Sequence, residues 1–148
     1  MKELLIKLNA CKNARDWAAN KSWQKIYNTC HRGDWLLWLF KKTNPDNLQL
    51  LTLAKGHCAN TVRYLMKDKR SIVAVDAAIA FGEGRISKKE LRTADAAAYD
   101  AADAAAAAAD AAADAAAAAY AAVAAAKKET QQKTADICRQ FLTLNFDI

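Results

Sequence analysis

An alanine tract in the second half of the chain constrains the fold more than any other feature. Between positions 94 and 126, 25 of the 33 residues are alanine. Alanine is the best helix former, and neither glycine nor proline occurs from position 86 to the end. Ser87 and Glu90, three positions apart, form a capping-box pattern just before the tract. The sequence therefore predicts a long helix that begins near Ser87.

The tract is patterned as an amphipathic helix rather than as a low-complexity tail. At about 100° per residue, its acidic residues share one arc of roughly 140°, with the tyrosines in or beside it. Val123, Ile137 and Phe141 lie on the opposite side. The acidic strip consists of Asp95, Tyr99, Asp100, Asp103, Asp110, Asp114 and Tyr120. We expect alanine methyl groups to face inward and the strip to face solvent or a partner.

The length of this helix raises a packing problem. A straight helix from Ser87 to Leu142 would be about 80 Å long, about twice the width of a compact domain of this size. We expect it to be kinked or broken near residues 110–130, or else to pack on a second copy. Small side chains permit close approach, so we expect tryptophan-rich helices to dock on the alanine face, for example at Ala112 and Ala116.

The first half of the chain is expected to form several short helices. The sequence has only 4 glycines and 1 proline in 148 residues, which argues against a β fold. We predict a single all-α domain over residues 1–148. Its body of short, tryptophan-rich helices covers residues 1–84, and the long Ala/Asp helix with its C-terminal continuation covers residues 85–148.

Local signals predict several helix boundaries and contacts in this body. The expected N-caps are Ser22, Asp34 and Ser71. The apolar run 35–40 predicts a helix that is buried on every side, and residues 45–70 predict one longer helix. A later helix is expected to stop at Gly82 or Gly84.

Two residues interrupt the apolar helical patterns. Gly56 is expected to mark either a close packing contact or a break in its helix. Asp76 lies in an otherwise apolar segment. We expect it to form a structural ion pair rather than to act in catalysis, because an unpaired buried charge is costly. Its candidate partners are Arg63, Arg70 and Arg92.

Charge is distributed unevenly along a chain whose net charge is +6. Residues 1–93 carry 18 Lys or Arg against 8 Asp or Glu, whereas residues 94–126 carry five Asp and no base. A basic body attracts nucleic acid, nucleotides or acidic proteins, and an acidic strip attracts basic partners. The alternative is that both surfaces are only solvated.

Motifs that would indicate an enzyme or a cofactor are missing from the sequence. We find no glycine-rich phosphate loop, nucleophile elbow or HExxH pattern. The adjacent pairs Cys30–His31 and His57–Cys58 lack zinc-site spacing, and neighbouring helical residues point about 100° apart. Asp110 and Asp114, one turn apart, have no further ligand on their face. We therefore predict no catalytic residue, no cofactor and no metal.

A second set of polar residues is a candidate ligand site. If residues 45–70 form one helix, these side chains share a face that offers cations, hydrogen-bond donors and an aromatic ring, which suits a nucleotide or phosphate. The set consists of His57, Asn60, Arg63, Tyr64 and Lys67. An ordinary exposed polar face is the alternative.

The sequence also predicts where the protein resides. The N-terminal apolar run is short and is broken by Lys7 and Asn9, unlike a signal peptide. Five aspartates make the alanine tract unsuitable for a membrane. We expect a cytoplasmic protein that does not enter membranes and whose cysteines are reduced and mostly buried.

The chain carries, in this order, "DWLLWLF", "LTLAKGHCANTVRYLMKD", "AVDAAIAFGEGRISKKEL", the alanine–aspartate–tyrosine tract and "KKETQQKTADICRQFLT". In these segments, over nearly its whole length, it resembles a family of alanine-rich immunity proteins of bacteria and their phages. The resemblance implies an all-helical, non-enzymatic protein that neutralises a toxin or effector by binding it, with no catalytic group in the shared segments.

Three functions are therefore considered. The first is an immunity-type inhibitor that holds a basic protein partner on the acidic strip. The second is a bacterial or phage protein that sequesters a nucleotide or nucleic acid through its basic body. The third is a structural homo-oligomer built on the alanine helix.

Overall fold

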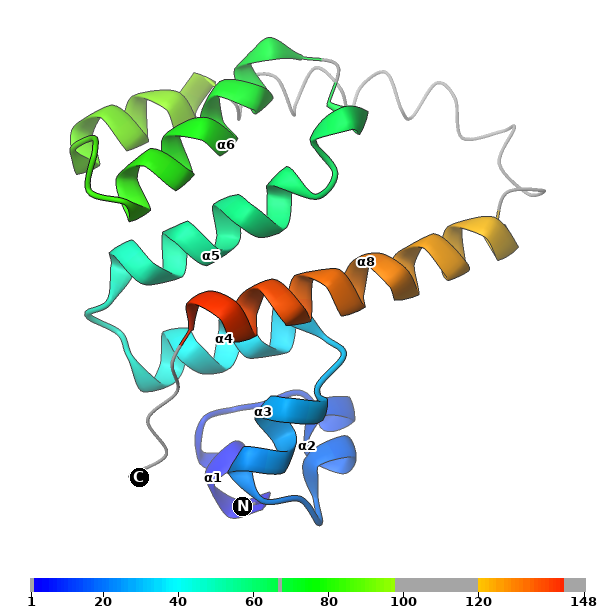
Figure 1. The fold of residues 1–148 in the computed structure, drawn as a ribbon. Coiled ribbons are helices and arrows are strands. Elements are labelled where there is room, and N and C mark those ends of the chain that lie inside the picture. The colour runs from blue at the N-terminus through cyan, green and yellow to red at the C-terminus, as the bar shows by residue number, and fades with distance from the viewer. Residues whose placement is uncertain (1, 67, 98–119, 143–148) are drawn as a thin grey trace.

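The structure, a computed structural model, describes residues 2–66, 68–97 and 120–142, and in this part of the chain helices are joined by turns and loops, without a β-strand. It confirms the predicted all-α class (Figure 1). The elements are α1 (Lys2–Lys7), α2 (Lys12–Ala18), α3 (Trp23–Thr29), α4 (Gly33–Thr43), α5 (Leu48–Asn60), a 3₁₀ turn (Arg63–Leu65), α6 (Lys69–Gly82), a helix over residues 88–97, and α8 (Tyr120–Phe141). None of the helices described is both long and apolar enough to cross a membrane.

Several predicted caps are confirmed. The Ser22 hydroxyl accepts a hydrogen bond from the Lys25 amide at the start of α3. The Glu90 amide donates to Ser87 Oγ at 3.3 Å, and the Glu90 carboxylate accepts from the Ser87 amide at 2.8 Å, which completes the capping box. Gly84, with φ +75°, ends α6 in the left-handed conformation that glycine adopts most readily.

Two predicted N-caps are wrong. Arg32 precedes α4, and Asp34 lies inside the first turn, where its carboxylate accepts hydrogen bonds from the Arg32 guanidinium. Asp68 caps α6 in place of Ser71, because its carboxylate accepts a hydrogen bond from the Arg70 amide. Both acids stabilise helix N-termini by their charge and by their hydrogen bonds.

The single long helix predicted over residues 45–70 is also wrong. Asn47 caps α5, which ends at Asn60. Thr61 follows, and both its amide and its hydroxyl donate to the Cys58 carbonyl. A threonine hydroxyl that binds a backbone carbonyl competes with continued helix, and Val62, also β-branched, favours helix little.

Glycine allows α5 and α6 to pack closely. A Cβ on Gly56 would lie 2.8 Å from Ile79 Cγ1, and one on Gly82 would lie 2.7 Å from the Leu53 Cα. Gly56 therefore marks a packing contact, which is one of its two predicted roles. The ion pair predicted for Asp76 joins the 3₁₀ turn to α6, since its carboxylate accepts two hydrogen bonds from the Arg63 guanidinium.

The main core lies where α8 crosses α4 and α5. Its most buried side chains come from all of these helices and from the link before α4: Cys30, Leu36, Phe40, Ala54, Ala135, Cys138 and Leu142. In Figure 1, α5 lies between α6 and α8, and α1–α3 form a separate layer beside α4. That layer has a smaller core of Leu5, Ala10, Ala18 and Ile26.

The 88–97 helix and α8, on either side of the alanine tract, do not lie on one line. The 88–97 helix lies beside α6, whereas α8 contacts α4 and α5 (Figure 1). One straight helix from Ser87 to Leu142 is therefore excluded. The predicted bend near residues 110–130 and the docking of tryptophans at Ala112 and Ala116 fall largely outside the described residues.

Candidate functional site: a pocket lined by tryptophans

A cavity of about 450 Å³ lies between the α1–α3 layer and α4. The protein has 4 tryptophans, and all of them line this cavity: Trp17 on α2, Trp23 on α3, and Trp35 and Trp38 on α4. Its deepest wall is apolar and buried, with Ala18, Ile26, Leu36 and Leu39. Concave, mainly apolar cavities of this size are the usual form of small-ligand sites.

The sequence of α4 explains how the pocket forms. Residues 35–40 are all apolar, but only Leu36, Leu39 and Phe40 are buried; Trp35 and Trp38 are half-buried. Leu36, Leu39 and Phe40 belong to the core that α8 shares. Trp35 and Trp38 pack against the edge of this core, line the pocket and remain half-buried, so the prediction that this helix is buried on every side is wrong.

Small residues on α2 leave room for the indole rings. Ala14 and Ala18 lie one turn apart on α2, and both line the cavity. The α1–α2 link also contributes Asn9, whose backbone adopts φ 60°. Asn9 donates its amide to Ile6, and the Ala10 amide donates to Leu5, a Schellman-type helix end in which asparagine tolerates positive φ.

The polar side of the pocket is formed by an ion pair. The Arg32 guanidinium donates hydrogen bonds of 2.8 and 2.6 Å to the two carboxylate oxygens of Asp34, and both residues line the cavity. These hydrogen bonds from Arg32 hold the pKa of Asp34 below its usual value. The pocket therefore has charged groups at one side, and they already satisfy each other.

Cations also lie against the indole rings. The Arg32 guanidinium lies 4.8 Å from the ring centroid of Trp35, and Lys21 Nζ lies 4.1 Å from that of Trp17. The Trp17 and Trp35 rings are 6.0 Å apart at 59°, and His31 contacts Trp17 edge-on at 6.2 Å. Cation–π contacts of this kind hold the indoles in place and add positive charge around them.

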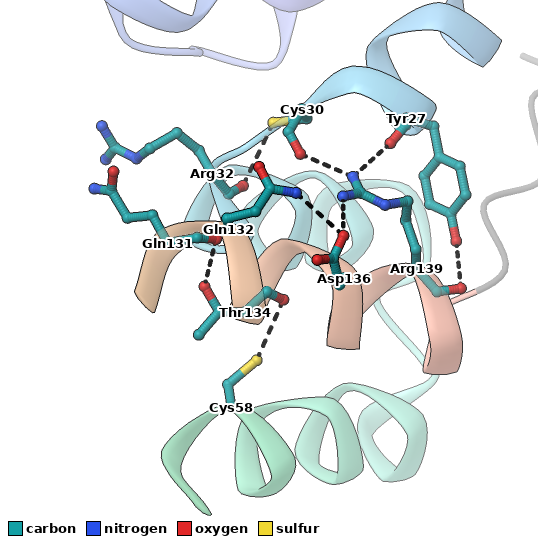
Figure 2. A network of polar contacts seen from close by, with 9 residues as sticks. All are labelled: Tyr27, Cys30, Arg32, Cys58, Gln131, Gln132, Thr134, Asp136 and Arg139. Atoms are coloured by element: carbon teal, nitrogen blue, oxygen red, sulfur yellow. Dashed lines mark hydrogen bonds and ion pairs between the residues drawn. The ribbon is translucent and has the colours of Figure 1, made fainter. Parts of the chain in front are cut away.

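Arg139 of α8 fixes the segment that leads into the pocket wall (Figure 2). Its guanidinium donates to the Tyr27 carbonyl at 3.0 Å and to the Cys30 carbonyl at 2.8 Å. In return, the Tyr27 hydroxyl lies 2.9 Å from the Arg139 carbonyl and 2.7 Å from that of Leu142. Burial raises the pKa of Tyr27, so its hydroxyl remains a donor. The Arg139–Tyr27 contacts therefore hold the end of α3 against α8. They also hold in place the segment after α3, which carries Arg32.

The structure describes one member of the predicted acidic strip in full. Asp95 is exposed on the 88–97 helix and lines a shallower depression together with Lys55, Lys88 and Arg92. For the other members of the strip, the side chains lie outside the described residues: Tyr99, Asp100, Asp103, Asp110, Asp114 and Tyr120.

The alternative ligand residues do not share one helical face, because α5 ends at Asn60. The His57 ring stacks on Phe141 at 4.4 Å and 8°. Arg63 is paired with Asp76, and Tyr64 is 82% exposed on the 3₁₀ turn. Asn60 is exposed, and Lys67 lies outside the described residues. That they bind a ligand stays a prediction.

Sequence reasoning missed the pocket, although one signal was available. All four tryptophans fall between positions 17 and 38, beside small residues at positions 10, 14 and 18. In the part of the chain that the structure describes, no group of three or more His, Cys, Asp or Glu side chains is placed to hold a metal ion.

In comparisons of the chain with family models, with curated proteins and with solved structures, nothing matches.

Proposed function

We propose that this is a non-enzymatic, immunity-type binding protein that neutralises a toxin or effector protein, and that an apolar side chain of this partner inserts into the tryptophan pocket. The observation that carries the proposal is the 450 Å³ apolar cavity lined by Trp17, Trp23, Trp35 and Trp38. Buried aromatic residues contribute much of the binding energy at protein interfaces, and an anchor side chain in a pocket is their usual counterpart.

The acidic strip is proposed to attract the same partner. Like charges on a basic toxin and on the Lys- and Arg-rich body would repel, whereas the strip offers the opposite sign. Opposite charges mainly raise the association rate, while the pocket supplies the contact that slows dissociation. The proposed strip residues are Asp95, Tyr99, Asp100, Asp103, Asp110, Asp114 and Tyr120.

For the whole chain we propose the predicted arrangement, in which a body of short helices, residues 1–84, packs on the alanine-rich segment, residues 85–148. The contacts of α8 with α4 and α5 support it. We also propose that the protein acts in the cytoplasm.

A growth-rescue assay tests the function. The chain is co-produced in bacteria with each of a panel of basic nuclease toxin domains, and we expect growth to be restored with at least one. Ala14→Trp should abolish rescue, because Ala14 lines the cavity and an indole there would fill it. Val73→Trp, at a 55% exposed position on α6, is the matched control and should rescue normally.

The result also separates the pocket from the strip. A triple variant with Asp103→Asn, Asp110→Asn and Asp114→Asn should associate more slowly with the toxin that the unmodified chain neutralises. Its pocket should be unchanged. Full rescue by a folded Ala14→Trp variant would show that the pocket is not the contact. Equal association rates for the triple variant and the unmodified chain would rule out the strip.

A second candidate function uses the same pocket for a flat small molecule such as a nucleotide. The observation that favours it is the set of indole rings, since aromatic side chains stack on bases, together with the surrounding cations. Any ligand that binds only the folded state raises the melting temperature. A thermal-shift screen with nucleotides, repeated on Ala14→Trp, would therefore show stabilisation of the unmodified chain alone.

A further inference from the structure

Cysteines from separate segments of the chain meet in the main core. Cys138 on α8 has 0% of its surface exposed, and Cys30, just after α3, has 2%. Cys58 on α5 is half-buried and packs against the same core. The fourth cysteine, Cys11, is exposed and lines the tryptophan pocket, not this core.

The register of α5 and α8 brings Cys58 and Cys138 together. Cys58 Sγ lies 3.6 Å from the carbonyl oxygen of Thr134 (Figure 2). In an α-helix that carbonyl points toward the amide four residues later, which here belongs to Cys138. Cys58 also packs against the core cluster to which Cys138 belongs. Cys58 and Cys138 are thus neighbours, although 80 positions separate them in the sequence.

We propose that Cys58 and Cys138 are a thiol-modification site, at which a hydroperoxide forms an internal disulfide between α5 and α8. The Cys58 thiolate attacks the terminal oxygen of the hydroperoxide, the O–O bond breaks, and the released alkoxide or hydroxide takes up the proton that Cys58 lost and leaves as an alcohol or water. Cys58 is then a sulfenic acid. The Cys138 sulfur attacks the Cys58 sulfur, the S–O bond breaks, and the oxygen leaves as water with the Cys138 proton. Two thiols are oxidised and one hydroperoxide is reduced.

The surroundings assign the two roles. Cys58 is half-buried, so a small peroxide reaches it first, whereas Cys138 is enclosed. The interaction between the two thiols lowers the pKa of Cys58, and the same interaction, with burial, raises the pKa of Cys138. The thiolate is the reactive form, so Cys58 is the attacked thiol and Cys138 the resolving one.

Peptide mapping tests the proposal directly, because the four cysteines fall on four different tryptic peptides. They are residues 8–12, 26–32, 56–63 and 134–139. The full chain is treated with hydrogen peroxide, alkylated and digested without reductant. We expect peptide 56–63 linked to peptide 134–139, and a melting temperature raised by about 5–10 °C until dithiothreitol is added.

Variants separate this pair from the other thiols. Cys30→Ser and Cys11→Ser should leave the linked peptide unchanged. Cys138→Ser should leave Cys58 as a sulfenic acid that dimedone labels, and circular dichroism checks that this variant is folded. The proposal is overturned if peroxide leaves both peptides unlinked, if Cys138 links to Cys30 instead, or if only disulfides between molecules form.

Discussion

At the scale of single residues, Gly33 shows how closely the start of α4 approaches α8. It is buried, and a Cβ at this position would lie 2.7 Å from the carbonyl carbon of Thr134. Its own carbonyl lies 3.5 Å from the Cys138 thiol. No side chain fits without moving one helix away from the other, because the nearest atoms belong to backbone as well as to side chain.

We therefore expect Gly33→Ala to lower the free energy of unfolding by about 1–3 kcal/mol, the usual cost of overpacking. Urea unfolding followed by circular dichroism measures it. Gly84→Asn is the matched control: Gly84 has positive φ, which asparagine tolerates, and a Cβ there would meet no atom closer than 4.0 Å. If both variants unfold at the same urea concentration as the unmodified chain, the close contact at Gly33 is wrong.

At the scale of elements, α8 is attached to α3 by hydrogen bonds as well as by packing. Arg139→Met would leave the carbonyls of Tyr27 and Cys30 without their donor, and we expect a loss of about 1.5–3 kcal/mol in the free energy of unfolding. Lys133→Met, elsewhere on α8, should change it little, because Lys133 is exposed and pairs only with Glu129 among the contacts described. Equal effects of the two variants in urea unfolding would contradict this.

Tyr27→Phe tests the other half of the same contact. The ring keeps its packing while the carbonyls of Arg139 and Leu142 lose a hydroxyl donor, so we expect a loss of about 1 kcal/mol. Tryptophan emission should shift as well, because Tyr27 lies on α3 beside Trp23, which lines the pocket. An unchanged spectrum would mean that the pocket wall does not depend on this contact.

Local signals predicted the all-helical class and some helix ends, and missed others. Ser22 and the Ser87–Glu90 box were predicted because a cap depends on residues within one turn. The start of α4 was misplaced because Gly33 is selected by contact with Thr134, which is distant in sequence. Hydrophobic periodicity likewise could not show that one side of residues 35–40 faces the pocket. The side chains that line the pocket and those that fill the core are both apolar, so the sequence does not distinguish them.

At the scale of the whole molecule, the free energy of unfolding should depend on pH in a defined acidic range. Arginine hydrogen bonds lower the pKa values of Asp34, Asp68 and Asp76, that of Asp68 to about 2. In the unfolded chain the pKa of Asp is about 3.9. The stabilisation from these ion pairs is therefore complete above that pH and is lost as the pH falls toward about 2. We expect the urea midpoint to fall from about pH 4 downward, and less steeply in Asp68→Asn.

The contacts of α8 also set an order of events during synthesis. Leu36 and Phe40 belong to the same core as Ala135, Cys138 and Leu142, but Ala135 is translated 95 residues after Phe40 (135 − 40). Until then α4 has an uncovered apolar face, and the end of α3 lacks its arginine. We expect the nascent chain to need protection by chaperones until α8 has been translated, because the main core closes only then.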